Sequence, residues 1–187
     1  MAGMTTQHDI TRISPVALAT CVEHSLHTSL DGFDLKRARL YGVAVVDPQG
    51  VVDNADGALR ITFLAEHGDV YELLDAPTSA IARMFDAAVV LTCGWAAPVS
   101  DDESNSEFSG PPSEHPLRRR VRLVVAVGDE GVGSVLRFAD SPNEVVCDPG
   151  SARGSLADAV TNLWFDPKVV VQREGVARAQ TSSDPRP

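Results

Sequence analysis

This 187-residue sequence contains little cysteine, few aromatic residues and no long apolar run. Its three cysteines, Cys21, Cys93 and Cys147, are odd in number and widely spaced, unlike a disulfide framework or a zinc knuckle. No window approaches the ~18 consecutive apolar residues of a membrane-spanning helix, so we expect no membrane partner. The N-terminal stretch also lacks the apolar segment of a secretion signal. These absences predict a cytoplasmic protein.

Basic residues are also scarce, with 16 lysines and arginines against 26 acidic residues, a formal net charge of −10. This balance opposes non-specific attraction to nucleic acid or anionic lipid, and we therefore expect no nucleic-acid partner. Apolar residues make up 43% of the chain and charged residues 22%, which is ordinary globular usage. A chain of this length buries a substantial core without metal or disulfide, so the sequence implies no cofactor.

The stretch 118–139 predicts a long β-hairpin, around which we expect the rest of the chain to be organised. Apolar residues recur at every second position from Val121 to Val127, with arginines at alternate positions. The turn is Gly128-Asp129-Glu130-Gly131, and the return arm runs to Ala139. The alternation predicts a half-buried strand, and arginines on an edge strand would deter aggregation.

Apolar patterns elsewhere predict helices and strands on both sides of this hairpin. Three helices are predicted. The first starts at Pro15, and its apolar face comprises Leu18, Cys21, Val22, Ser25, Leu26 and Leu30. A short one covers 78–85, with Ile81, Met84 and Phe85 as its apolar stripe, and the last follows Ser155, with Leu156, Val160, Leu163 and Trp164 buried. The predicted strands are 40–46, a second hairpin of 59–66 and 69–74 joined at His67-Gly68, a central strand 87–93 without polar alternation, and two short candidates at 144–147 and 169–171.

Together these elements predict a single α+β domain over 14–171, with a largely antiparallel sheet of about six to seven strands covered by two to three helices. A flexible arm, 1–13, and a flexible tail, 172–187, flank it. Within the domain, 100–116 is rich in Ser, Pro and acidic residues and predicts a mobile acidic loop. The order of elements resembles that of profilin-like and roadblock-like folds, and a shared element order implies no function.

Cys93 is the candidate nucleophile, because it lies where a buried strand gives way to a loop. A cysteine nucleophile needs a base, and the candidates are His115 and His67. The competing interpretation is that Cys93 is a small buried apolar residue, as free cysteines usually are. His24 and His27 lie three residues apart on the first helix, but no third ligand is evident, and we interpret both as solvated polar residues.

The densest basic run supplies the candidate ligand-binding residues, Arg118, Arg120 and Arg122. A guanidinium group suits bidentate contact with a carboxylate, so an acidic small molecule is one candidate ligand. Internal pairing with the acidic residues that precede the run is the alternative. No aromatic residue lies nearby in the sequence to stack bases, which again disfavours single-stranded nucleic acid.

Two functional classes remain open. The sequence favours a non-catalytic binding or self-associating domain, because no set of nucleophile, base and orienting group emerges. We expect a homodimer, since two-fold dimers are the commonest assemblies and apolar strands must cover or pair their edges. The alternative is a small hydrolase or transferase that uses Cys93 with His115 or His67.

Overall fold

The computed structural model describes residues 14–29, 32–46, 58–98, 110–148 and 154–165. The predicted arm and tail, most of the predicted acidic loop and the predicted strand 169–171 lie outside these residues. The elements are α1 (Pro15–Ser29), β1 (Ala38–Val46), β2 (Ala58–His67), α2 (Val70–Asp75), the 3-10 helix η1 (Pro77–Met84), β3 (Ala87–Ala96), β4 (Arg119–Gly128), β5 (Gly131–Phe138), β6 (Val145–Asp148) and α3 (Ser155–Phe165).

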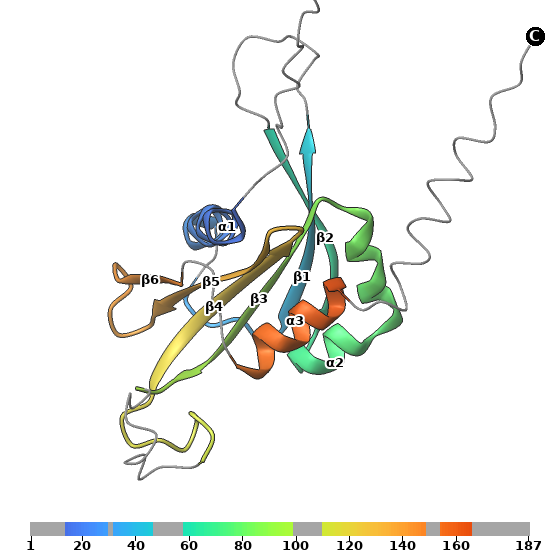
Figure 1. Cartoon of the computed structure of the whole chain (residues 1–187). Helices are drawn as coiled ribbons and strands as arrows, with labels where there is room; N and C mark the ends of the chain where they lie inside the picture. Colours follow the sequence, from blue (N-terminus) through green and yellow to red (C-terminus); the bar gives the residue numbers. More distant parts are fainter. Residues whose placement is uncertain (1–13, 30–31, 47–57, 99–109, 149–153, 166–187) are drawn as a thin grey trace, which may run out of the picture.

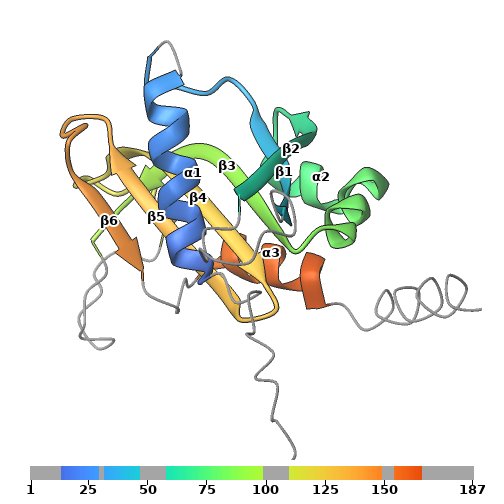
Figure 2. The same cartoon turned by 90° about the horizontal axis from the view of Figure 1, so that it is seen from above.

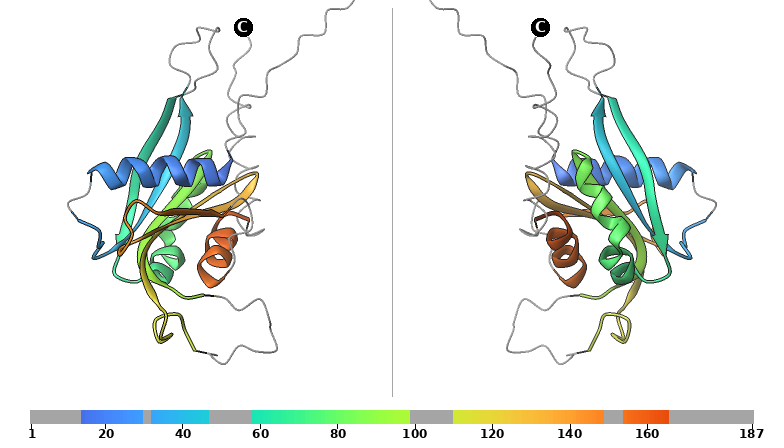
Figure 3. Two further views of the ribbon diagram at one scale, coloured as in Figure 1. Left: turned by 90° about the vertical axis from the view of Figure 1, so that its left-hand side faces the viewer. Right: turned by 90° about the vertical axis from the view of Figure 1, so that its right-hand side faces the viewer.

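The six strands form one antiparallel sheet in the order β2-β1-β3-β4-β5-β6. Figure 1 shows α1 on one side of this sheet and α2, η1 and α3 on the other. Seen from above, α1 crosses β4 and β5 (Figure 2). No helix of the described residues lies over the β1–β2 end of that face of the sheet. The two opposite views of Figure 3 place α1 in front of the sheet in one and behind it in the other. The predicted α+β fold with a largely antiparallel sheet is confirmed.

A separate apolar core fills each face of the sheet, because the two central strands, β3 and β4, are buried on both sides. Beneath α1, Val89, Leu91 and Val124 pack against Leu18 and other helix residues. On the opposite face, Val90 and Val125 belong to the second core, which also contains residues of α2 and α3. The prediction that β3 is central is therefore confirmed. The sheet separates the two apolar cores and contributes side chains to both.

The predicted organising hairpin is present as β4 and β5, with Asp129 and Glu130 in the turn between them. Gly131 has φ +114°, a left-handed conformation that a residue with a side chain rarely adopts. Gly133 is required for a different reason, since a Cβ there would lie 2.5 Å from the backbone nitrogen of Val16. The start of α1 thus rests directly on the backbone of β5.

The prediction of β4 as a half-buried strand is wrong, and the arginines do not lie on a sheet edge. This strand lies between β3 and β5, and both of its faces are covered. The side chain of Arg122 is fully buried beneath α1. The sequence pattern is misleading because an arginine that has a buried carboxylate partner can occupy a core position.

The prediction of a second hairpin is wrong in its return arm, because Val70–Asp75 forms α2. Asp69 is its N-cap, and the carboxylate accepts hydrogen bonds from the backbone N–H groups of Tyr71 and Glu72 at 2.8 and 3.1 Å. Such a cap satisfies donors that a helix start leaves unpaired, and it outweighs the strand preference of Val70 and Tyr71.

The predicted apolar faces of two helices also need correction. In η1, Ile81 and Met84 are exposed, and the buried residues are Ser79, Ala82 and Arg83. In α1, Cys21 and Ser25 are exposed, and the buried residues include Ala19 and Glu23. In α3, Val160, Leu163 and Trp164 are buried as predicted, while Leu156 is only partly buried. The 3-10 geometry of η1, with about three residues per turn, explains why a 3.6-residue period fails there.

Candidate functional site

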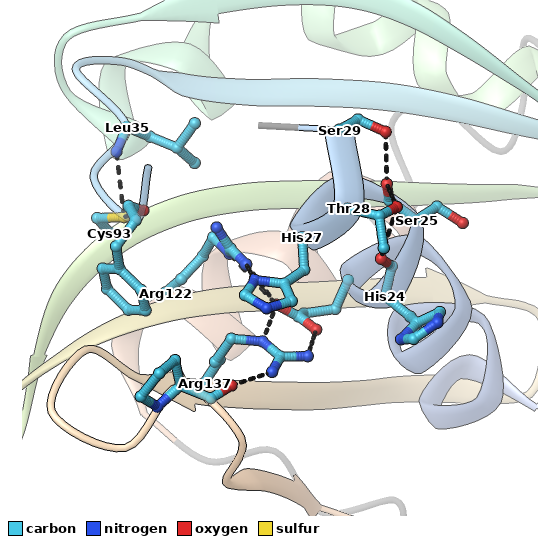
Figure 4. Close-up of polar contacts among 12 residues, drawn as sticks. His24, Ser25, His27, Thr28, Ser29, Leu35, Cys93, Arg122 and Arg137 are labelled. Atoms are coloured by element: carbon cyan, nitrogen blue, oxygen red, sulfur yellow. Dashed lines mark hydrogen bonds and ion pairs between the residues drawn. The ribbon is translucent and has the colours of Figure 1, made fainter. Parts of the chain in front are cut away.

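The most unusual feature of the structure is a charged cluster between α1 and the sheet, formed by the buried Glu23, Arg122 and Arg137 and the partly buried His27. Figure 4 labels His27, Arg122 and Arg137. Arg122 pairs directly with Arg137 across β4 and β5. Because directly opposite residues point to the same face, both guanidinium groups project toward α1. Glu23 and His27 are four residues apart on α1, which places them on one side of the helix. The sheet therefore supplies the cations and the helix supplies their acceptors.

Glu23 joins the two arginines. Its Oε1 accepts hydrogen bonds from Arg122 Nη2 at 2.8 Å and Arg137 Nε at 2.6 Å, and its Oε2 accepts one from Arg137 Nη2 at 2.5 Å. The side chains of Glu23 and Arg122 are 1% and 0% exposed. Burial alone would raise the pKa of Glu23, but the hydrogen bonds and charges of Arg137 and Arg122 together lower it. The carboxylate is therefore held in its ionised form.

His27 completes the contacts of Arg122 on the helix side. Its Nδ1 lies 2.9 Å from Arg122 Nη2, and because arginine is always a donor, the imidazole nitrogen is the acceptor. Burial and then the charges of Arg137 and Arg122 lower the pKa of His27. The interpretation of His27 as a solvated residue is wrong, whereas His24 is exposed as expected.

The cluster carries more positive than negative charge, since two arginines face one carboxylate and the imidazole is held neutral. One donor is also left over: the buried Nη1 of Arg122 has no hydrogen-bond partner among the described residues. The Cζ atom of Arg122 lies 5.3 Å from the centre of the Phe33 ring, so an aromatic face offsets part of this excess charge. Further, Arg137 Nη1 donates to the carbonyl oxygen of Pro142.

Cys93 lies next to this cluster, directly opposite Arg122 in the pairing of β3 with β4. Its Sγ accepts a hydrogen bond from the backbone nitrogen of Leu35 at 3.4 Å and lies 3.7 Å from the carbonyl oxygen of Phe33. Burial raises the pKa of the Cys93 thiol, and the weaker opposing effect of Leu35 does not reverse this. The residue is half-buried rather than fully buried, and its environment favours the thiol over the thiolate.

The two candidate bases lie in other surroundings. His67 is at the end of the edge strand β2, where its Nδ1 accepts from the backbone nitrogen of Asp69 at 3.1 Å and its Nε2 lies 3.4 Å from Glu72 Oε2. His115 precedes β4, and its Nδ1 accepts from the backbone nitrogen of Leu117 at 3.0 Å. Across the described ranges, neither histidine is hydrogen-bonded to Cys93. The geometry does not bring the predicted nucleophile and bases together.

The predicted ligand-binding arginines also lie in different surroundings. Arg122 belongs to the buried cluster, whereas Arg120 Nε donates to Asp34 Oδ1 at 3.0 Å on the surface. Arg118 stacks on Trp95, with its Cζ 5.2 Å from the ring centre. Arg119, outside the predicted set, forms an ion pair with Asp140 at 2.6 Å and covers the Phe138 ring. No aromatic residue lies near this run in the sequence, but strand pairing brings Trp95 and Phe138 beside it in the structure.

Comparisons with known proteins add no assignment: no protein-family model, no curated protein and no solved structure matches this chain. No helix in the described ranges is both long and apolar enough to cross a lipid bilayer. Among those same residues, no group of three or more metal-ligating side chains gathers at one place. Function has to be inferred from the surfaces and charges of the domain itself.

Proposed function

We propose that this chain is a non-catalytic cytoplasmic domain that acts by self-association, two copies joining along β2 into one continuous sheet. The observation that carries the proposal is that, within the described part of the chain, β2 is an edge strand with no strand paired to its outer side. This strand is ten residues long and ends the sheet on one side, with Ile61 and Phe63 exposed by 41% and 53%. An edge strand presents unpaired N–H and C=O groups, which a second strand can satisfy. The opposite edge, β6, is only four residues long.

The pattern of β2 is self-complementary over its first part. Leu59, Ile61 and Phe63 lie on one side of the strand, and the Phe63 ring packs edge-on against Tyr41 at 5.8 Å. A two-fold axis beside Ile61 would set Ile61 opposite its own copy and Leu59 opposite Phe63 of the second copy. The same patch then serves both copies, as a two-fold interface requires.

The register of β2 also limits where the second copy fits. Leu40 pairs with Ala65 and Tyr41 with Phe63, so Leu64 is an extra residue that bulges the strand. Bulges bend a strand and interrupt regular pairing. We therefore place the interface before the bulge, over 58–63. α1 lies over β4 and β5, and among the described residues no helix covers the apolar side of this segment.

A catalytic role for Cys93 with His115 or His67 has less support. The raised pKa of the Cys93 thiol lowers its thiolate fraction at neutral pH, and both histidines make other contacts. An acidic small-molecule ligand at Arg118, Arg120 and Arg122 also has less support, because Arg122 is buried and already paired.

The experiment is a mass measurement by light scattering across micromolar concentrations, on the wild-type chain and two matched variants. Ile61→Lys places a charge at the centre of the proposed interface. Ile81→Lys is the control, because Ile81 is similarly exposed, by 46%, but lies on η1. We expect a dimer for the wild type and the control, and a monomer for Ile61→Lys with an unchanged circular dichroism spectrum. A monomeric wild type would contradict self-association, and a dimeric Ile61→Lys would contradict the interface.

A further inference from the structure

Besides the β2 edge, a second exposed surface lies where β3 ends and β4 begins (Figure 1). Trp95 on β3 pairs directly with Arg120 on β4, and its side chain is 42% exposed. The Cζ atoms of Arg118 and Arg120 lie 5.2 and 5.4 Å from the centre of the Trp95 ring. Leu117, 66% exposed, precedes them in the chain. We call these four residues the Trp95 surface.

The guanidinium groups of this surface differ from those of the buried cluster in being accessible. Arg118 forms no ion pair with any residue in the described part of the chain, and its guanidinium group lies over the Trp95 ring. Arg120 contacts Asp34, whose side chain is 69% exposed. A guanidinium that stacks by its face keeps its N–H edge available for a bidentate contact with a carboxylate. Arg120 already donates from Nε to Asp34 and from Nη1 to the carbonyl oxygen of Gly94, so its Nη2 and the guanidinium of Arg118 supply the donors for a ligand.

We infer that the Trp95 surface docks an acidic peptide segment of a partner protein, with Arg118 and Arg120 binding its carboxylates and Trp95 and Leu117 contacting a neighbouring apolar side chain. Charge complementarity carries this choice, because two guanidinium groups lie together over Trp95 and one of them, that of Arg118, has no ion pair among the described residues. Tryptophan and arginine are also the residues most enriched among those that dominate binding energy at protein interfaces. The inference does not depend on self-association through β2.

Single-stranded nucleic acid is the competing polyanion, and two observations disfavour it. Two guanidinium groups already lie over the Trp95 ring, where a base would have to stack. A nucleic acid also carries a charge on every phosphate and would extend past this small patch over an acidic protein. A short acidic peptide meets only the patch itself.

The test uses tryptophan fluorescence, because the chain has two tryptophans and the other, Trp164, is buried beneath the opposite face. The full chain is titrated with a capped peptide of four glutamates around one leucine, with its glutamine analogue, and with a single-stranded DNA oligomer. The variants are Arg118→Gln and Arg120→Gln, with Arg37→Gln as the control, since the side chain of Arg37 is 61% exposed and lies before β1, outside both proposed surfaces. Circular dichroism checks that each variant is folded.

We expect the glutamate peptide to change Trp95 fluorescence and to bind at least about tenfold more weakly to Arg118→Gln and Arg120→Gln, with Arg37→Gln unaffected; tenfold is about 1.4 kcal/mol. The glutamine peptide should not bind. The proposal is overturned if the glutamate peptide does not bind at millimolar concentration, if all three variants weaken it equally, or if DNA binds more tightly than the peptide.

Discussion

Arg122 and Arg137 stand directly opposite each other on neighbouring strands, with both guanidinium groups buried beneath α1. Like charges in directly opposite positions of a sheet destabilise it. Glu23 offsets this repulsion, because its carboxylate accepts hydrogen bonds from both guanidinium groups. The same contacts of Glu23 therefore hold α1 on the sheet and allow two arginines to lie side by side in the core.

Glu23→Gln is expected to lower the free energy of unfolding by about 3–5 kcal/mol, because breaking a buried ion pair leaves an uncompensated charge. Glutamine keeps the shape but removes the negative charge that the two arginines share. Urea denaturation measures the change. Glu72→Gln is the control, since Glu72 is exposed and its carboxylate lies 3.4 Å from the exposed side chain of His67, with no other ion pair among the described residues. Equal stability of the two variants would show that the cluster contributes little.

The stability of the fold should decrease as the pH falls below neutrality, and His27 should cause part of this decrease. The pKa of His27 is lowered in the folded state, so the unfolded chain takes up the proton first, near its ordinary value of about 6.5. The contribution is full above that pH and is lost as the pH falls through the folded pKa. Protonation removes the acceptor for Arg122 and adds charge beside Arg137.

Urea denaturation at pH 7.5 and 5.5 tests this contribution of His27. His27→Gln retains an acceptor for Arg122 and should lose less stability between the two pH values than the wild type. His67→Gln, a change at an exposed histidine at the end of β2, should behave as the wild type does. Besides the two arginines, Glu23 and His24 act on the charge of His27, and Glu23 remains ionised across this range because its pKa is lowered. An identical pH dependence in wild type and His27→Gln would contradict the prediction.

Gly133→Ala should destabilise the protein by about 1–3 kcal/mol, the cost of inserting a methyl group into a tightly packed contact. The added Cβ would meet backbone atoms of Pro15 and Val16, which cannot rotate away as a side chain could. Gly94→Ala is the matched control in β3, because a Cβ there meets nothing within 4 Å. Thermal melting of the two variants compares them, and equal melting temperatures would show that α1 shifts without cost.

Cys93 should react more slowly with a maleimide than Cys21 and Cys147 do in the native protein. Burial raises the pKa of its thiol, whereas the other two cysteines are exposed. Mass spectrometry of peptides after timed labelling gives the three rates, and labelling in urea should remove the difference. Preferential labelling of Cys93 in the native state would instead favour the nucleophile interpretation.

Much of the sheet could be predicted from local sequence, because its patterns lie within short stretches. The β4–β5 hairpin needs only two apolar arms and a glycine-flanked turn, and the central position of β3 follows from its unbroken apolar run. The end of β2 could not be predicted so simply. Val70 and Tyr71 favour a strand, and the side-chain cap from Asp69 decides for the helix.

The buried cluster could not be predicted, since its members are distant in sequence. Glu23 lies 99 residues from Arg122 and 114 from Arg137. One local signal existed: Glu23 is four residues after Ala19, on the buried side of α1. A charged residue on an apolar helix face implies a partner of opposite charge, but only the strand order identifies the partner. The same non-local pairing places Trp95 beside Arg120.

The distance in sequence between Glu23 and Arg137 has a consequence for synthesis of the chain. The ribosome adds about 5–20 residues per second, so α1 is made on the order of ten seconds before its partner strand β5. During this interval the apolar face of α1, with Leu18 and Val22, has no sheet to cover it. Newly made chains should therefore depend on chaperones until β5 emerges, however stable the finished domain is.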